Sequence, residues 1–154
     1  MSLESVRAFL ASKAPDVAII PLESGSTTST VSAFLNVQPA QVAKALMLKV
    51  GERNLLLMAC GDSRLDNRKV KEVFGGKARM VAPEEAAILT GHPVGGVCPF
   101  ALATPLPVYC DIRLKTFDIV VPGGGSTHSA VPIDPTRMAT LAGAEWVDVC
   151  EEPR

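Results

Sequence analysis

Two apolar segments separated by turn-forming residues constrain the fold of this chain more than any other feature. Residues 42–50 read Val-Ala-Lys-Ala-Leu-Met-Leu-Lys-Val, and a second apolar run follows at Asn54–Cys60. The residues between them, Gly51-Glu52-Arg53, form a good hairpin loop. We therefore expect paired strands at Ala43–Val50 and Asn54–Cys60.

Lys44 is out of place in the first of these strands. Side chains alternate between the two faces of a strand, so Lys44 shares a face with Leu46 and Leu48, while Lys49 lies on the other face. A lysine on an apolar face must snorkel to water, pair with another group or line a cleft. From the strand pattern alone, the simplest interpretation is a structural lysine whose stem packs on the sheet.

The other elements follow one another without an obvious linker. Helices are expected at Leu3–Ala14, Thr30–Asn36, Asp66–Phe74, Pro83–Leu89 and Pro135–Ala142. Further strands are expected at Val17–Leu22, around Val81, and at Val108–Ile112, Asp118–Val121, Ala130–Ile133 and Glu145–Val149. Strands joined by both hairpins and helices imply an α+β fold, a mixed sheet with helices packed outside. A length of 154 residues, 47% of them apolar, fits one domain over 1–154.

Charge and hydropathy exclude several classes of protein. The formal net charge of −1 argues against a protein that coats nucleic acid, DNA included, through bulk electrostatics. No apolar run approaches the roughly 20 residues that span a bilayer. The first ten residues are typical of an amphipathic helix and not of a signal peptide. We therefore expect a cytoplasmic protein with no membrane partner.

Residues 62–79 carry a local excess of positive charge. Six basic and three acidic residues give a balance of +3: Arg64, Arg68, Lys69, Lys71, Lys77 and Arg79 against Asp62, Asp66 and Glu72. A solvated helix face explains this pattern. The alternative is a small patch that steers a nucleic-acid end, which predicts weak and salt-sensitive binding.

The four cysteines, at positions 60, 98, 110 and 150, are widely spaced. We expect reduced and mostly buried thiols. Cys98 lies close to His92, so a small-molecule hydrolase that uses this pair as nucleophile and base is one alternative. Two histidines without ligand spacing predict no metal site.

Two glycine-rich segments lie in the second half of the chain. Residues 90–100 read Thr-Gly-His-Pro-Val-Gly-Gly-Val-Cys-Pro-Phe, and residues 122–129 read Pro-Gly-Gly-Gly-Ser-Thr-His-Ser. Such loops offer backbone N–H groups to a ligand without side chains in the way. A plain connection that needs positive φ angles is the simpler explanation, and both can hold together.

Together with the strand that carries Lys44, these segments resemble the YbaK/prolyl-tRNA-synthetase-associated editing domains, including the freestanding ProX-type proteins. The matching pieces are the apolar strand, the Thr90-Gly91-x-x-Val94-Gly95-Gly96-x-x-Pro99 loop and the glycine turn at 123–125, in the family's order and approximate spacing. The resemblance covers about 17–149. It implies a curled, largely antiparallel mixed sheet with a cleft on its concave side, and a hydrolase that deacylates mischarged aminoacyl-tRNA in trans.

The resemblance also implies the site residues. Lys44 matches the family's essential residue, and the backbone N–H groups of Gly95 and Gly96 would stabilise the oxyanion formed when water attacks the ester. The remaining substrate-binding positions it implies are Thr27, Ala45, Pro99, Ser126, His128 and Ser129. The substrate's own ribose hydroxyl or amino-acid side chain is expected to assist, and no metal or cofactor is expected.

Substrate specificity is less constrained. Family members clear small residues, mostly from tRNA for proline, and we expect alanine or a near analogue such as 2-aminobutyrate. Thr27 falls where some relatives place an aromatic pocket wall, and Ser129 where some carry an acid. Expected partners are the acceptor end of tRNA and prolyl-tRNA synthetase, with the protein itself a monomer or weak dimer. The competing interpretation is a module that binds an aminoacyl or nucleotide group, or docks on a synthetase, without hydrolysis.

Overall fold

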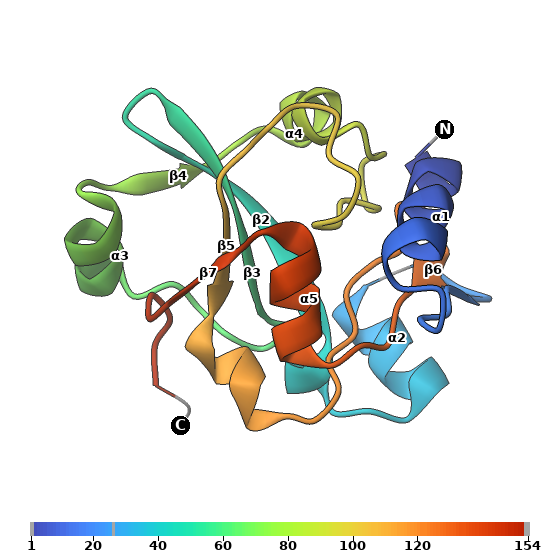
Figure 1. The fold of residues 1–154 in the computed structure, drawn as a ribbon. Coiled ribbons are helices and arrows are strands. Elements are labelled where there is room, and N and C mark those ends of the chain that lie inside the picture. Colours follow the sequence, from blue (N-terminus) through green and yellow to red (C-terminus); the bar gives the residue numbers. More distant parts are fainter. Residues whose placement is uncertain (1, 26, 153–154) are drawn as a thin grey trace.

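The sheet at the centre of the molecule is mixed (Figure 1). The computed structural model describes residues 2–25 and 27–152. The sheet has the strand order β4-β2-β3-β5-β7, with bounds Ala78–Met80, Ala43–Val50, Arg53–Cys60, Val108–Asp111 and Glu145–Val147. β2 pairs antiparallel with β3 and β4, whereas β5 pairs parallel with β3 and β7. A separate antiparallel pair joins β1 (Ile20–Pro21) to β6 (Ser129–Ala130). The predicted α+β class and mixed sheet are confirmed, and half of the pairings in the central sheet are antiparallel.

Helices surround this sheet. Within the described ranges they are α1 (Ser2–Lys13), α2 (Thr28–Leu35), α3 (Asn67–Phe74), α4 (Pro83–Thr90) and α5 (Pro135–Ala142), with 3₁₀ turns at Pro39–Gln41 and Ile112–Thr116. Local chemistry sets their ends, as α3 illustrates. The Asp66 side chain accepts from the backbone N–H of Lys69, and Gly75 stops the helix with φ 83°. None of the described helices combines the length and the hydropathy that crossing a bilayer demands.

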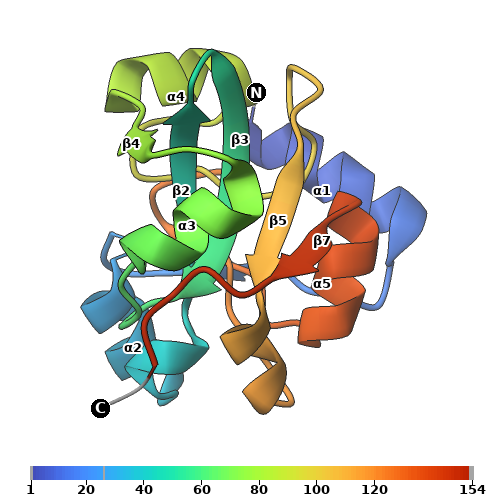
Figure 2. The ribbon, with the colours of Figure 1, turned by 90° about the vertical axis from the view of Figure 1, so that its left-hand side faces the viewer.

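Different helices cover the two faces of the sheet. On one face, Leu48 of β2 and Leu57 of β3 pack against Phe74 of α3, and Figure 2 shows α3 lying in front of these strands. On the other face, Met58 of β3 packs in a core that includes residues of α1 and α5. Because alternate residues of a strand face opposite sides, Lys44 belongs to the α3 face of β2.

Several predicted strands are shorter than expected. Only Ile20–Pro21 of the segment 17–22 pairs, and segments 118–121 and 130–133 meet mainly through an isolated bridge between Val120 and Ile133. Prolines explain this, because Pro21 and Pro122 have no N–H to donate to a longer ladder. The strand expected around Val81 lies just before it, at Ala78–Met80, since Pro83 starts α4.

Candidate active site

A cavity of about 290 Å³ lies beside the first half of β2, and we call it the cleft. β2 supplies Ala43, Lys44, Ala45 and Met47. The other walls come from α2, from the end of β4 and the start of α4, and from both glycine-rich segments: Thr28, Val31, Val42, Met80, Val81, Pro83, Ala86, 94–97, 121–123 and 129–130. The fold therefore brings together five of the predicted site residues, namely Lys44, Ala45, Gly95, Gly96 and Ser129.

A tight turn shapes the wall formed by residues 94–97. The Gly96 N–H donates to the Pro93 carbonyl over 2.8 Å, and Gly95 has φ 82° at the third position of this turn. A type II turn requires a positive φ at that position, which explains the glycine. The hydrogen bond has a second consequence. The Gly96 N–H, expected as an oxyanion donor, is already occupied, so Gly95 is the one of the two expected donors whose N–H does not close this turn.

The second glycine-rich segment lies directly against this turn. A Cβ atom on Gly96 would lie 2.8 Å from the backbone carbon of Ser126 and 2.9 Å from Cγ of Pro93. A Cβ on Gly95 would meet Thr127 Cγ2 at 3.5 Å, an ordinary contact. Gly96 is thus required for close packing of two backbones, and Gly95 for the backbone conformation.

Lys44 lies at the boundary of the cleft. It contributes to the lining, but its ammonium donates to the carbonyls of Ser63 (2.5 Å) and Gly61 (3.4 Å), in the loop after β3. This loop adjoins the cleft, because a Cβ on Gly61 would lie 2.6 Å from Cγ2 of Thr28, a lining residue. An ammonium has three N–H donors. Two are therefore directed at the loop, which leaves one for a ligand.

Four predicted substrate-binding residues are not among those that line the cleft. Thr27 instead caps α2, where its hydroxyl accepts from the Thr30 N–H (3.2 Å), and its neighbour Thr28 reaches the cleft. Pro99 is buried, two residues after Val97 of the cleft wall. Sequence reasoning missed Thr28, although threonine is a favoured N-cap residue and Thr27 stands just before a predicted helix.

The other two, Ser126 and His128, support the cleft or face solvent. The Ser126 hydroxyl donates to the buried Ser129 hydroxyl over 2.8 Å, and so holds a residue that does line the cleft. His128 is exposed, and its Nδ1 hydrogen-bonds the hydroxyl of Thr127.

His92 ties the two glycine-rich segments together. It is buried, its Nε2 lies 2.7 Å from the Phe100 carbonyl, and its Nδ1 hydrogen-bonds the Ser2 hydroxyl. Ser2 in turn donates to the Gly125 carbonyl (2.5 Å). Burial lowers the pKa of His92, so the ring is neutral at pH 7. Because a carbonyl only accepts, the proton of this neutral ring belongs on Nε2.

The geometry argues against Cys98 as a nucleophile. Its Sγ lies 3.5 Å from His92 Nε2, but that nitrogen directs its proton to Phe100 and cannot accept another. Burial raises the pKa of Cys98 to about 12, and neither residue lines the cleft. All four cysteines are free and buried, as predicted.

The basic segment 62–79 is only partly available to a ligand. Arg64, Arg68, Lys71, Lys77 and Arg79 are exposed. Lys69 instead forms ion pairs with Asp148 and Glu152.

A family model supports the resemblance drawn from the motifs. The model for the aminoacyl-tRNA editing domain matches residues 23–141, most of the chain. The chain therefore belongs to the aminoacyl-tRNA editing domain family, which is related to the editing function of prolyl-tRNA synthetases.

Individual relatives cover different extents of the chain. It is 37% identical over 155 residues to the uncharacterized protein YwhH of Bacillus subtilis, with 99% of each covered. It is 34% identical over 82 residues to the proline–tRNA ligase of Bacillus cytotoxicus, a match that covers 53% of this chain and only 14% of the ligase. Among solved structures, a candidate trans-editing enzyme for prolyl-tRNA synthetase superposes with a TM-score of 0.89 at 29% identity, covering 98% of both chains.

Proposed function

We propose that this protein is an aminoacyl-tRNA deacylase that acts in trans on tRNA for proline carrying a small wrong amino acid, alanine or 2-aminobutyrate. One observation carries the proposal: in a chain of the editing family, Lys44 and the Gly95 turn border the same cleft. We further propose that residues 1–154 act as one cytoplasmic editing domain, and that prolyl-tRNA synthetase is its partner.

The size and lining of the cleft support a small, uncharged aminoacyl group. At about 290 Å³ the cleft is at the lower end of the range for ligand pockets, about 300–1,000 Å³. Valine, alanine and methionine side chains supply most of its walls. Burial of a charged side chain there without a partner would cost several kcal/mol, whereas a methyl or ethyl group gains from it.

The chemistry requires stabilisation of negative charge. Water adds to the ester carbonyl carbon, and charge develops on the carbonyl oxygen before the bond to the ribose oxygen breaks. We assign two donors to this oxygen or to the ribose, the N–H of Gly95, which lines the cleft, and the N–H of Lys44 that is not directed at the loop. The water proton finally resides on the leaving ribose oxygen, and the neighbouring ribose hydroxyl of the substrate orients the water.

A binding module is the second candidate, and one observation favours it. No carboxylate, imidazole or thiol side chain is found among the described residues that line the cleft. A protein that only holds an aminoacyl or nucleotide group would need none of them. Substrate-assisted hydrolysis also needs none, so only turnover separates the two functions.

The test is a deacylation panel. Purified protein is incubated with tRNA for proline carrying alanine, 2-aminobutyrate, cysteine, serine, threonine or proline, and release of each amino acid is measured. Lys44→Ala should reduce the release of the preferred residue by about 100-fold or more, a loss typical of an oxyanion donor. Lys49→Ala is the matched control, because Lys49 lies in the same strand on the opposite face and is 3.9 Å from Glu85.

The outcomes separate the two functions. Release of one small residue by wild type and by Lys49→Ala, but not by Lys44→Ala, supports the enzyme. Wild-type activity in a folded Lys44→Ala variant would exclude a catalytic role for this lysine. No release by wild type across the panel, with retained binding of the charged tRNA, would establish the binding module.

A further inference from the structure

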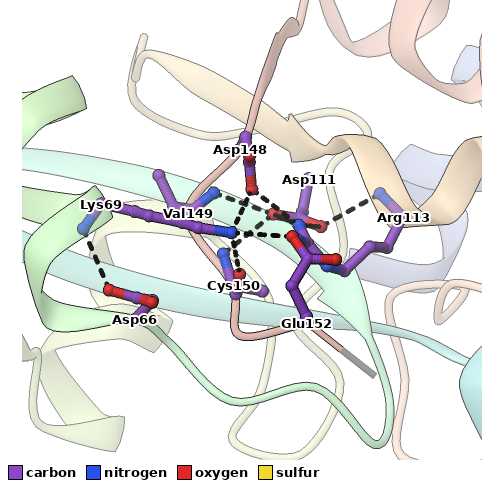
Figure 3. Close-up of polar contacts among 8 residues, drawn as sticks. All are labelled: Asp66, Lys69, Asp111, Arg113, Asp148, Val149, Cys150 and Glu152. Atoms are coloured by element: carbon purple, nitrogen blue, oxygen red, sulfur yellow. Dashed lines mark hydrogen bonds and ion pairs between the residues drawn. The ribbon is translucent and has the colours of Figure 1, made fainter. Parts of the chain in front are cut away.

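We propose that a charged cluster at the carboxyl end of β5, at the same end of the sheet as Lys44, is a positioning device for the Lys44 ammonium. The cluster consists of Lys69, Asp111, Arg113, Asp148 and Glu152 (Figure 3). It fixes residues 148–152, called here the strap, against the loop whose carbonyls hold Lys44. The expected effect on turnover rests on the proposed function, whereas the expected effect on the position of the ammonium is independent of it.

Asp111 is the buried centre of the cluster. It ends β5 and has no exposed surface. Its Oδ2 accepts from the backbone N–H groups of Val149 (3.1 Å) and Cys150 (3.2 Å), and its Oδ1 accepts from the backbone N–H of Arg113 (3.0 Å). A buried carboxylate needs such donors, since leaving it unpaired would be costly. The strap is therefore attached to β5 by one side chain.

Two cations from different elements complete the attachment. Arg113, in the 3₁₀ turn after β5, donates to Asp148 (2.8 Å) and Glu152 (2.6 Å). Lys69 of α3 donates to the same two carboxylates and to the Cys150 carbonyl, all within 3.1 Å. The Arg113 side chain is only 11% exposed, so water screens its contacts less than those of a surface pair.

The strap in turn fixes the residues that follow Ser63. The Asp66 N–H donates to the Val149 carbonyl (2.8 Å), and the Glu151 N–H donates to the Arg64 carbonyl (2.8 Å). Between them, residues 65 and 150 form an antiparallel bridge. Residues 64–66 thus behave as a short strand whose only β-partner among the described residues is the strap.

The loop between β3 and this short strand holds Lys44. The loop begins at Cys60, whose carbonyl accepts from the Ser63 N–H (3.0 Å), and the Ser63 carbonyl faces the ammonium at 2.5 Å. β3 fixes one end of the loop, and the strap fixes the other. If the strap is released, the Ser63 carbonyl loses its fixed position, and the ammonium loses the shorter of its two hydrogen bonds to this loop.

The experiment compares Arg113→Met with Arg137→Met. Both remove an arginine that pairs with carboxylates, but Arg137 pairs with Asp16, between α5 and the turn after α1, and neither residue belongs to the cluster. The first readout is the ¹⁵N NMR signal of the Lys44 ammonium, assigned by its absence in Lys44→Ala. The second is kcat and KM for the best substrate of the deacylation panel.

We expect Arg113→Met to shift and broaden the Lys44 signal and to lower kcat about 10-fold, with KM changed less than about 2-fold, because small displacements at a reacting centre cost rate more than binding. Arg113→Lys should restore part of kcat, since lysine keeps the charge but not the two-pronged geometry. Arg137→Met should change neither readout.

Other outcomes decide the proposal. An unchanged Lys44 signal and kcat in a folded Arg113→Met variant would overturn it. If Arg113→Met does not fold, the double variant Asp148→Asn, Glu152→Gln replaces it, because these two side chains are 45% and 74% exposed and the Asp111–Arg113 pair stays intact. If wild type releases nothing from any tRNA, the proposed function fails, and the NMR readout alone still decides whether the cluster places Lys44.

Discussion

The cleft and the charged cluster differ in the groups that build them. The cleft borders the first half of β2 and is built from glycine backbone and small apolar side chains. The cluster includes two residues of the strap and is built from five charged side chains drawn from four parts of the chain. Lys44 lines the first, while the loop that holds its ammonium is fixed by the second. The comparison teaches that backbone shape and small side chains form the cleft, whereas charged groups outside its lining hold the loop that contacts Lys44.

The largest effect on the cleft is expected from Gly96→Ala. The new methyl group would lie within 3.0 Å of backbone atoms of Ser126, so the two walls must separate. We expect deacylation to fall about 100-fold or more and unfolding free energy to fall about 1–3 kcal/mol, the range for overpacking. Turnover assays and urea unfolding measure both. Gly76→Ala is the control, since its Cβ meets only a side-chain carbon at 3.5 Å, and wild-type turnover in Gly96→Ala would contradict the close-packing argument.

A smaller effect is expected from Gly95→Ala, which tests the need for a positive φ angle and not the need for close packing. Alanine at φ 82° costs about 1–2 kcal/mol, and its Cβ meets only an ordinary contact with Thr127. We expect about 10-fold slower deacylation, because the turn relaxes and the donor N–H moves. Gly51→Ala at φ 61 ° in the β2–β3 hairpin imposes similar strain away from the cleft. Equal loss of activity in both variants would show that global strain, and not the turn, is responsible.

The smallest effect is a dependence of stability on pH that arises at His92. Its pKa lies below the ordinary 6.5 in the folded protein, so the unfolded chain binds the proton first as the pH falls. The free energy of unfolding should therefore decrease as the pH drops below about 6.5, by at most about 1.4 kcal/mol per pH unit.

Urea unfolding of wild type and His92→Gln from pH 5 to 7.5 measures this dependence. In His92→Gln, the free energy of unfolding should depend less on pH than in wild type. His128→Gln, at an exposed position, serves as the control and should keep the pH dependence of wild type. Parallel curves for wild type and His92→Gln would show that the link between the two glycine-rich segments does not depend on a neutral ring.

The sequence predicts the elements around the cleft well, because their signals are local. The bounds of β2 and α5 match the expectation. An apolar run that ends at a hairpin loop, and a helix that begins at a proline and is followed by a glycine, are strong patterns. The glycine-rich motif predicts a connection that needs positive φ angles, and Gly95 adopts one. The use of the Gly96 N–H within the tight turn at Gly95 could not be predicted, because it depends on the turn type adopted.

The sequence carries no comparable local signal for the charged cluster. Asp111, Lys69 and Glu152 are separated by some 40 residues each way, and only the parallel pairing of β5 with β3 and β7 brings them together. Lys69 therefore looked like part of a solvated helix face. The direction of the Lys44 ammonium could not be predicted for the same reason. The Ser63 carbonyl that accepts from it is positioned by strap residues about 85 positions downstream.

The burial of the four thiols turns them into reporters of motion. Cys60 ends β3, Cys98 lies beside the Gly95 turn, Cys110 is in β5 and Cys150 is in the strap. Burial raises the pKa of Cys60 to about 11 and that of the other three to about 12. Because the thiolate is the form that reacts, an alkylating reagent can label each position only after that part of the protein opens. The order in which the four sites are labelled would thus rank the strap, the cleft wall and the sheet by how often each one opens.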